Sequence, residues 1–257
     1  MRFKIFIFSI IFVFCLGADS LLRCRSIKSI GELDSAIANA ENLILAKKKD
    51  IHTLYSLSQL LISRGKYDKS RQYLDIILKK HPHHIDSQLL LARLNLRQYR
   101  FKEAGDILKT AAGRDSGNIS LQLLQARIAL LKMDFTASER IYRSILREKP
   151  GSAEALTGLA DIFFRQYEYN ESEKYIKKCL KNHPDFPPAY LLYAKIHRLR
   201  QHTEKWIKAV RKAAELDPLN PKALAALAYV MVQGERNPSG GAQLWRQTLF
   251  PSGVTGH

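Results

Sequence analysis

The chain has 257 residues, of which 46% are hydrophobic and 25% charged, and it carries a formal net charge of +17 with a pI of about 9.8. The apolar content is sufficient for a sizeable core and excludes general disorder. Such a positive excess favours an acidic partner, whether protein, nucleic acid, anionic polysaccharide or anionic lipid, without choosing among them. The three cysteines, Cys15, Cys24 and Cys179, form no CxxC pair, which argues against a disulfide framework or a zinc site.

The N-terminal segment has the parts of a secretory signal. Arg2 and Lys4 form a short basic region, residues 5–16 are apolar except for Ser9, and Gly17 and Ala18 are small residues suited to cleavage. This apolar run is short for a transmembrane helix, which needs roughly 20 residues. We predict a signal peptide at 1–18 and an exported protein of the periplasm or cell envelope, or a secreted one. An uncleaved membrane anchor remains the alternative.

Residues 19–50 are predicted to form an N-terminal segment that contains one capping helix. Residues 31–37 read like the start of the second helix of a helix pair, and Gly31 lies 34 positions before Gly65. We expect this helix to span about 29–48 and to cover the first of the repeats that follow.

Prolines reveal the period of the rest of the chain. Pro82, Pro150, Pro184 and Pro218 are separated by 68, 34 and 34 residues, and Ser116 of an RDSGN turn lies at the midpoint of the longest gap. Proline ends a helix because it lacks an N–H group and clashes with the preceding turn. Five turn signals therefore share one 34-residue register.

Other residue types follow the same register. The columns comprise small residues (Ser58, Ala92, Ala126, Ala160, Ala194, Ala228), aromatic residues (Tyr67, Phe101, Phe135, Tyr169), further small residues (Ser70, Ala104, Ser138, Ser172) and apolar residues (Leu74, Leu108, Tyr142, Ile176, Val210; Ile77, Ala111, Ile145, Cys179, Ala213). Small residues let paired helices approach closely, and large apolar residues fill the space to the next pair. Cys179 is accordingly predicted to be a small buried residue.

These columns resemble the tetratricopeptide repeat, whose period is 34 residues. Leu156, Leu159, Ala160, Tyr169 and Pro184 carry its signature within one unit. The resemblance implies an all-α, right-handed superhelical solenoid of antiparallel helix pairs, with five repeats at 51–84, 85–118, 119–152, 153–186 and 187–220. Three glutamines, Gln88, Gln122 and Gln125, stand where apolar residues are expected.

Residues 221–257 are predicted to form a C-terminal capping helix, running to about Val232, and a flexible tail. Pro221 is suited to the first turn of that helix. Within the tail, residues 242–250 form a candidate short amphipathic helix with Leu244, Trp245 and Leu249 on one face.

The sequence contains no catalytic signature that we recognise. A glycine-rich phosphate loop, an HExxH motif and a GxSxG motif are all missing from it. We therefore predict a non-enzymatic protein with no cofactor and no small-molecule substrate. His81, His83 and His84 are close enough in sequence to suggest a transition-metal site, but an exposed turn explains them as well, and we predict no metal site.

The predicted function is that of a scaffold for protein–protein interaction, in cell-envelope assembly or maintenance. In the family that the chain resembles, the first helix of each repeat lines the concave face, so residues 34 apart should form rows along a groove. The predicted groove residues are basic (Arg93, Arg97, Arg127, Arg165, Lys195) and apolar (Leu89, Leu123, Phe164, Leu191). They would suit a protein or peptide partner with acidic character. The alternatives are a binder of anionic polymer, a regulatory subunit of an envelope enzyme, or a solvated basic face in which Arg165 pairs with Asp161.

Overall fold

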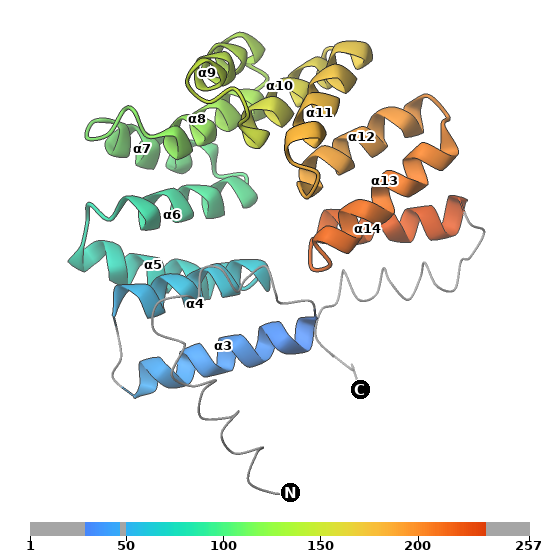
Figure 1. The fold of residues 1–257 in the computed structure, drawn as a ribbon. Coiled ribbons are helices and arrows are strands. Elements are labelled where there is room, and N and C mark those ends of the chain that lie inside the picture. Colours follow the sequence, from blue (N-terminus) through green and yellow to red (C-terminus); the bar gives the residue numbers. More distant parts are fainter. Residues whose placement is uncertain (1–28, 47–49, 235–257) are drawn as a thin grey trace, which may run out of the picture. The chain divides into compact units, whose positions relative to one another are not determined.

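The computed structural model describes residues 29–46 and 50–234, and in these two ranges every regular element is a helix (Figure 1). The predicted signal peptide and the predicted helix at 242–250 lie outside the described residues. No helix within the described ranges is long and apolar enough to cross a membrane. The chain divides into two compact units, residues 1–77 and 78–257, which are described one at a time.

The first unit contains α3 (Ile30–Leu45), α4 (Ile51–Ser63) and most of α5 (Tyr67–Lys80). Ser29 caps α3 by accepting a hydrogen bond from the Glu32 N–H, and Asp50 caps α4 by accepting one from the Thr53 N–H. Helices α3 and α4 pack together. The buried residues on these two helices include Leu33, Ile37, Leu57 and Leu61.

An ion pair fixes the end of α4 to α3. The Arg64 guanidinium donates to both carboxylate oxygens of Asp34, Nε to Oδ1 at 2.7 Å and Nη2 to Oδ2 at 3.2 Å. Hydrogen bonding from Arg64 lowers the pKa of Asp34. Because the Arg64 side chain is buried, this forked pair restrains α3 more strongly than an exposed ion pair would.

The second unit contains four helix pairs and a final helix within its described residues. The pairs are α6 (Ile85–Arg97) with α7 (Phe101–Ala112), α8 (Ile119–Leu131) with α9 (Phe135–Glu148), α10 (Ala153–Arg165) with α11 (Tyr169–Asn182), and α12 (Pro187–Leu199) with α13 (Thr203–Leu216). Helix α14 (Pro221–Tyr229) continues into the π-helical turn η2 (Val230–Gly234). The prediction of an all-α solenoid of consecutive helix pairs is confirmed.

The helices of this unit fall into two sets. We call α6, α8, α10, α12 and α14 the first helices, and α7, α9, α11 and α13 the second helices. From α6 to α12, each first helix contacts the next first helix, whereas a second helix mainly contacts its own partner and the first helix that follows. Consecutive first helices therefore lie closer together than consecutive second helices do, so the first helices form the inner face of this stack and the second helices its outer face.

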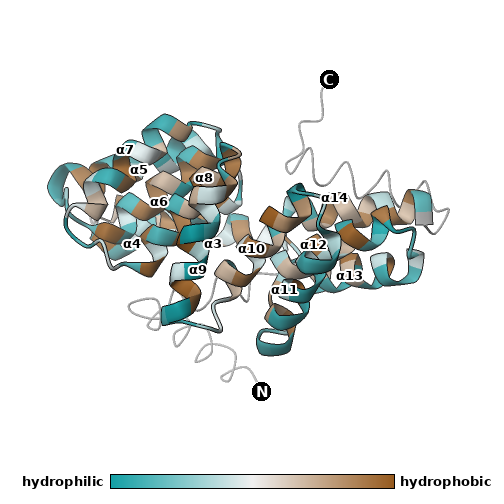
Figure 2. Cartoon of the chain, turned by 90° about the horizontal axis from the view of Figure 1, so that it is seen from above, coloured by the Kyte–Doolittle hydropathy of each residue, from teal (hydrophilic) through white to brown (hydrophobic). Residues whose placement is uncertain are grey.

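Local sequence signals account for where these helices begin and end. Asn118, Ser152 and Asn220 each cap a first helix by accepting a hydrogen bond from a backbone N–H of its first turn. Helices α9, α11 and α13 each end two residues before a proline, namely Pro150, Pro184 and Pro218. On the second helices, hydrophobic and hydrophilic residues lie on opposite faces, and the apolar faces contribute to the core. Figure 2 shows the hydropathy of each residue along the helices.

The two small columns pack where each first helix meets its partner. Ala92, Ala126 and Ala160 are fully buried. In addition, the Ser138 hydroxyl donates to the Ala126 carbonyl at 2.8 Å, and the Ser172 hydroxyl donates to the Ala160 carbonyl at 2.7 Å. In the first unit, Ser70 and Ser58 make the same bond at 2.9 Å. Serine in this column thus supplies a hydrogen bond between paired helices as well as a small volume.

Two of the three glutamines that depart from the repeat pattern bond to the turns between repeats. The Gln88 amide donates to the Pro82 carbonyl at 2.7 Å, and the Gln122 amide donates to the Ser116 carbonyl at 3.1 Å. Each bond spans six residues and supplies a turn carbonyl with a partner. Polar residues therefore replace apolar ones here without opening the fold.

Candidate partner-binding groove

Four of the predicted basic residues are exposed on first helices. Arg93 and Arg97 lie one turn apart on α6, Arg127 lies on α8 and Lys195 on α12. The 34-residue register places Arg93, Arg127 and Lys195 at equivalent positions of their helices. Since the first helices form the inner face, these cations are available to line it.

A further cation, Lys222 in the first turn of α14, lies within the electrostatic influence of three of these residues. The Lys222 side chain is exposed to solvent, but the surrounding protein removes part of its hydration. This partial desolvation is the main reason why the pKa of Lys222 is lowered, and repulsion from Arg127, Lys195 and Arg97 lowers it further. Asp161 opposes the shift by attraction. Side chains from α6, α8, α10, α12 and α14 therefore converge electrostatically, and the net charge of the five groups is positive. Sequence reasoning missed Lys222, because the register places it outside the rows of basic residues.

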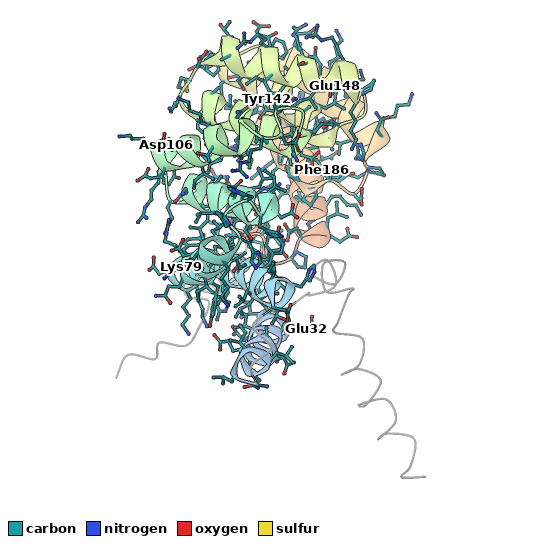
Figure 3. All side chains as sticks on the ribbon, turned by 90° about the vertical axis from the view of Figure 1, so that its left-hand side faces the viewer. Glu32, Lys79, Asp106, Tyr142, Glu148 and Phe186 are labelled. Atoms are coloured by element: carbon teal, nitrogen blue, oxygen red, sulfur yellow. The ribbon has the colours of Figure 1, made fainter. Side chains whose placement is uncertain are left out.

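Tyr142 brings a second helix to the same region. It lies on α9 (Figure 3), is 3% exposed, and packs with Leu130 and Leu159 between α8 and α10. Burial raises its pKa to about 12, with Arg127 lowering it and Asp161 raising it. The phenol therefore stays neutral at physiological pH beside those two charges.

Two predicted groove residues interact with other side chains. The Arg165 Nε lies 3.4 Å from the Asp161 carboxylate, one turn earlier on α10, and its Nη1 lies 3.7 Å from the Met133 sulfur. The Lys195 ammonium lies 5.9 Å from the centre of the Phe164 ring, a cation–π distance. Neighbouring repeats thus contribute to one continuous surface of charged and apolar groups.

The apolar part of the predicted groove needs a correction. Leu89 is only 6% exposed and packs in a core cluster with residues of α7 and α8, so it does not offer a contact surface. The reason is that adjacent first helices cover the sides of one another, which leaves a narrower exposed stripe than helical spacing alone predicts. Leu123, Phe164 and Leu191 are half-buried against core clusters and keep part of their surface.

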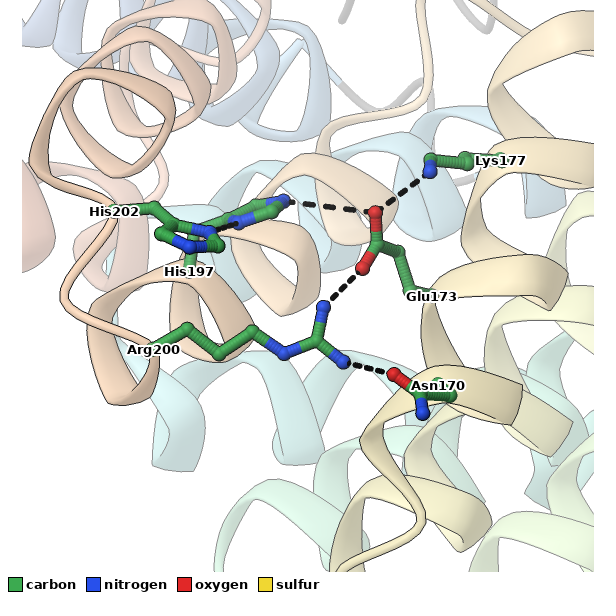
Figure 4. Close-up of polar contacts among 6 residues, drawn as sticks. All are labelled: Asn170, Glu173, Lys177, His197, Arg200 and His202. Carbon is green, nitrogen blue, oxygen red and sulfur yellow. Dashed lines mark hydrogen bonds and ion pairs between the residues drawn. The ribbon is translucent and has the colours of Figure 1, made fainter.

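A polar cluster that the sequence did not reveal joins α11 to α12 (Figure 4). Glu173 on α11 accepts a hydrogen bond from Arg200 and pairs with Lys177 at 2.7 Å. Burial raises the pKa of Glu173, but the hydrogen bonds from Lys177 and Arg200 outweigh it, and the net shift is downward. The ion pairs keep this half-buried carboxylate charged and tie consecutive repeats together.

Two histidines complete this cluster. The Nδ1 atoms of His197 and His202 are 3.1 Å apart, so one ring donates and the other accepts, and His197 Nε2 lies 3.9 Å from Glu173. Burial lowers the pKa of His197 against the attraction of Glu173, while Lys205, His202 and Arg200 lower it further. His197 is therefore held neutral near pH 7.

Of the three histidines considered for metal binding, His84 has a structural role. The His84 imidazole caps α6 by accepting from the Ser87 N–H at 3.3 Å. No group of three or more potential metal ligands is found in residues 29–46 and 50–234. Cys179 is a free, buried thiol, and burial raises its pKa, as expected for a small core residue.

The fold is that of a helical-repeat protein, and comparison with known proteins identifies which repeat family it belongs to. Tetratricopeptide repeat models match residues 55–119, 129–197 and 187–218, together more than half of the chain. The chain belongs to the tetratricopeptide repeat family, whose members are generally non-catalytic scaffolds that bind protein partners. No curated protein sequence matches it.

Solved structures share this fold at low sequence identity. A tetratricopeptide repeat protein from Parabacteroides merdae is 18% identical, with a TM-score of 0.71 over 82% of this chain and 81% of that one. TTC0263 from Thermus thermophilus is 15% identical, with a TM-score of 0.56 over 64% of this chain and 90% of that one. The APC/C hetero-tetramer Cut9–Hcn1 contains a chain that is 13% identical, with a TM-score of 0.62 over 89% of this chain and 46% of that one.

Proposed function

We propose that the second unit binds an acidic segment of a partner protein on the inner face of its first helices. We call the surface formed by Arg93, Arg97, Arg127, Lys195 and Lys222 the basic groove. The protein is then a non-enzymatic scaffold that recognises carboxylates through charge and holds apolar side chains on the half-buried residues beside them.

The main support for this proposal is the position of Lys222 among cations from three other first helices. Partial desolvation is the main cause of its lowered pKa, and repulsion from Arg127, Lys195 and Arg97 adds to it. A bound carboxylate would relieve this repulsion, and by linkage its binding would raise the pKa of Lys222. The guanidinium group of Arg97 or of Arg127 can bind a carboxylate by donating two parallel hydrogen bonds to it.

A peptide suits this surface better than nucleic acid does. Stacking platforms for successive bases need exposed aromatic rings that follow one another closely. Phe164 is half-buried and already lies near Lys195, and the exposed rings of Tyr99 and Tyr167 lie two repeats apart with Met133 at the turn between them. Half-buried Leu123 and Leu191 instead supply apolar surface for aliphatic side chains.

The proposal is tested by selecting binders from a displayed library of random linear peptides on the purified protein. We expect the enriched peptides to be acidic and their affinity to fall as salt is raised. The triple variant Arg93→Ala, Arg97→Ala, Arg127→Ala should bind a labelled selected peptide at least about tenfold more weakly, since each charge-assisted hydrogen bond contributes about 1.5–3 kcal/mol.

A matched control removes the same charge from the outer face. Lys109, Arg140 and Lys178 are exposed cations on three second helices, and changing all three to alanine should leave affinity nearly unchanged. Equal losses in both triple variants would mean that net charge, and not the basic groove, drives binding. Tighter binding to an oligonucleotide or an acidic polysaccharide than to any selected peptide would instead favour the anionic-polymer alternative.

We also propose that the protein is exported, with a role in assembling or maintaining the cell envelope, and that residues 1–18 are its signal peptide. The support is the basic, apolar and small-residue order of that segment. N-terminal sequencing of the native protein should begin at Ala18 or Asp19, and a retained Met1 in a membrane fraction would favour the anchor alternative.

A further inference from the structure

Four turns of the second unit and one of the first share an unusual backbone conformation. Tyr99, Met133, Tyr167 and Gln201 have positive φ angles of 59°, 64°, 65° and 58°, and Gly65 has φ of +80°. These positions are 34 residues apart, and each lies in the turn between the two helices of a pair. Glycine adopts this left-handed conformation without strain, whereas a side chain with a Cβ crowds its own backbone there.

The side chains in these strained turns are large and exposed. Tyr99 and Tyr167 are each 78% exposed and Met133 is 57% exposed. They contribute little to the core, so packing within this chain does not compensate for the strain. The turn needs the left-handed conformation, as Gly65 shows, but it does not need a large side chain there. A strained residue that packing does not compensate is typical of functional positions.

Hydrogen bonds hold the backbone of these turns in one conformation. At each one, the N–H of the left-handed residue bonds back to a carbonyl of the first helix, as in Tyr99 to Leu96, and the next N–H does the same. The Tyr99 ring lies edge-on to Phe101 at 6.1 Å, and the Tyr167 ring edge-on to Tyr169 at 6.3 Å. The backbone at these positions is therefore ordered before a partner binds, which lowers the entropic cost of binding.

The row continues the basic groove. Arg97, a groove residue, lies two residues before Tyr99, and Arg165 on α10 reaches the Met133 sulfur at 3.7 Å. The flanking cations are Arg97, Arg100, Lys132 and Arg165. They outnumber the carboxylates Asp134, which caps α9, Glu168, and Asp161, which pairs with Arg165. The surroundings of the row are therefore basic, which suits an acidic partner and disfavours a second copy of this basic chain.

We propose that Tyr99, Met133 and Tyr167, the turn row, form a contact surface for apolar side chains of the acidic protein segment that occupies the basic groove. This rests on the proposed function for the acidic character of the partner. Tyrosine and methionine are enriched at interfaces because they offer large, adaptable contact areas. The central methionine has no ring on which a base could stack, so the row fits a protein segment better than nucleic acid.

Glycine substitution tests the turn row without endangering the fold, since Gly65 already occupies this conformation. In the triple variant Tyr99→Gly, Met133→Gly, Tyr167→Gly, a fluorescein-labelled peptide selected on the wild-type protein should bind at least about tenfold more weakly by fluorescence anisotropy. The Tm should stay the same or rise because strain is released. The control Gln201→Gly makes the same backbone change at a polar position and should leave Kd unchanged.

Other outcomes overturn the turn row or separate it from the basic groove. An unchanged Kd in the glycine triple variant, and in a second triple variant with asparagine, which also tolerates this conformation, would refute it. Two other results would also refute it, if peptide binding stayed unchanged in the glycine triple variant. The first is that the wild-type protein self-associates in light scattering and the variant does not. The second is that the wild-type protein binds a labelled uridine oligonucleotide and the variant does not. If the arginine triple variant binds normally and the glycine triple variant does not, the basic groove fails while the turn row stands.

Discussion

Replacing Gly158 with alanine should destabilise the second unit, although alanine is the better helix former. Gly158 lies inside α10, and a Cβ built there would lie 2.3, 2.5 and 2.6 Å from Cζ, Cε2 and Cε1 of the Tyr142 ring. Carbon atoms in contact are normally about 3.5–4.0 Å apart. The ring must therefore move by more than about 1 Å, and Tyr142 is buried among Leu130, Ile145 and Leu159, which leave it little room.

The magnitude follows from two opposing effects. Helix propensity favours alanine over glycine by about 1 kcal/mol, whereas overpacking of a core costs about 1–3 kcal/mol or more. Because the overlap involves a rigid ring, we expect the upper end of that range and a net loss of about 2 kcal/mol. For a unit of this size the Tm should fall by about 4–8 °C.

Thermal unfolding followed by circular dichroism measures this effect against an internal control. Gly105 also lies within a helix, α7, but a Cβ there meets nothing within 4 Å, so Gly105→Ala should raise the Tm. In a Tyr142→Leu background the three ring carbons are gone, and Gly158→Ala should become neutral or stabilising. If Gly158→Ala alone raises the Tm as much as Gly105→Ala does, the close packing of ring on helix is refuted.

Three further predictions concern the stability of each unit. Ser172→Ala should lower the free energy of unfolding by about 0.5–1.5 kcal/mol, because it removes the hydrogen bond to the Ala160 carbonyl; no loss in denaturant titration would show that only the small volume matters. Gly65→Ala should cost the first unit about 1 kcal/mol through its positive φ alone, since a Cβ there meets nothing, and an unchanged Tm would contradict that strain. Because burial lowers the folded-state pKa of His197 below its ordinary value of about 6.5, the unfolded chain binds its proton first, so part of the free energy of unfolding should be lost as pH falls below about 6.5. Just below that pH, above the range where Glu173 titrates, a His197→Leu variant should lose less stability, and an equal loss would assign the effect to other groups.

The sequence by itself determined the helix pairs and their order. Helix capping by Asn118 and Ser152, and termination before Pro150 and Pro184, depend on atoms a few residues apart, so they are visible in sequence. The 34-residue register added the packing of the alanine column, because identical units stacked in one way repeat the same contacts. The cationic row from Arg93 to Lys195 could be named for the same reason, although its role in binding remains a prediction.

Only the tertiary structure decided what the inner face exposes. Leu89 has the helical spacing of a surface residue, but neighbouring helices bury it, while Lys222 joins three cations from helices far apart in sequence. The left-handed turns at Tyr99 and Tyr167 were likewise hidden, because neither residue type signals a positive φ as glycine does. Periodicity shows which residues are equivalent between repeats. Burial, convergence of charge and backbone strain depend instead on how each repeat packs against its neighbours. The distance between neighbouring repeats is set by the volumes of the side chains packed between them.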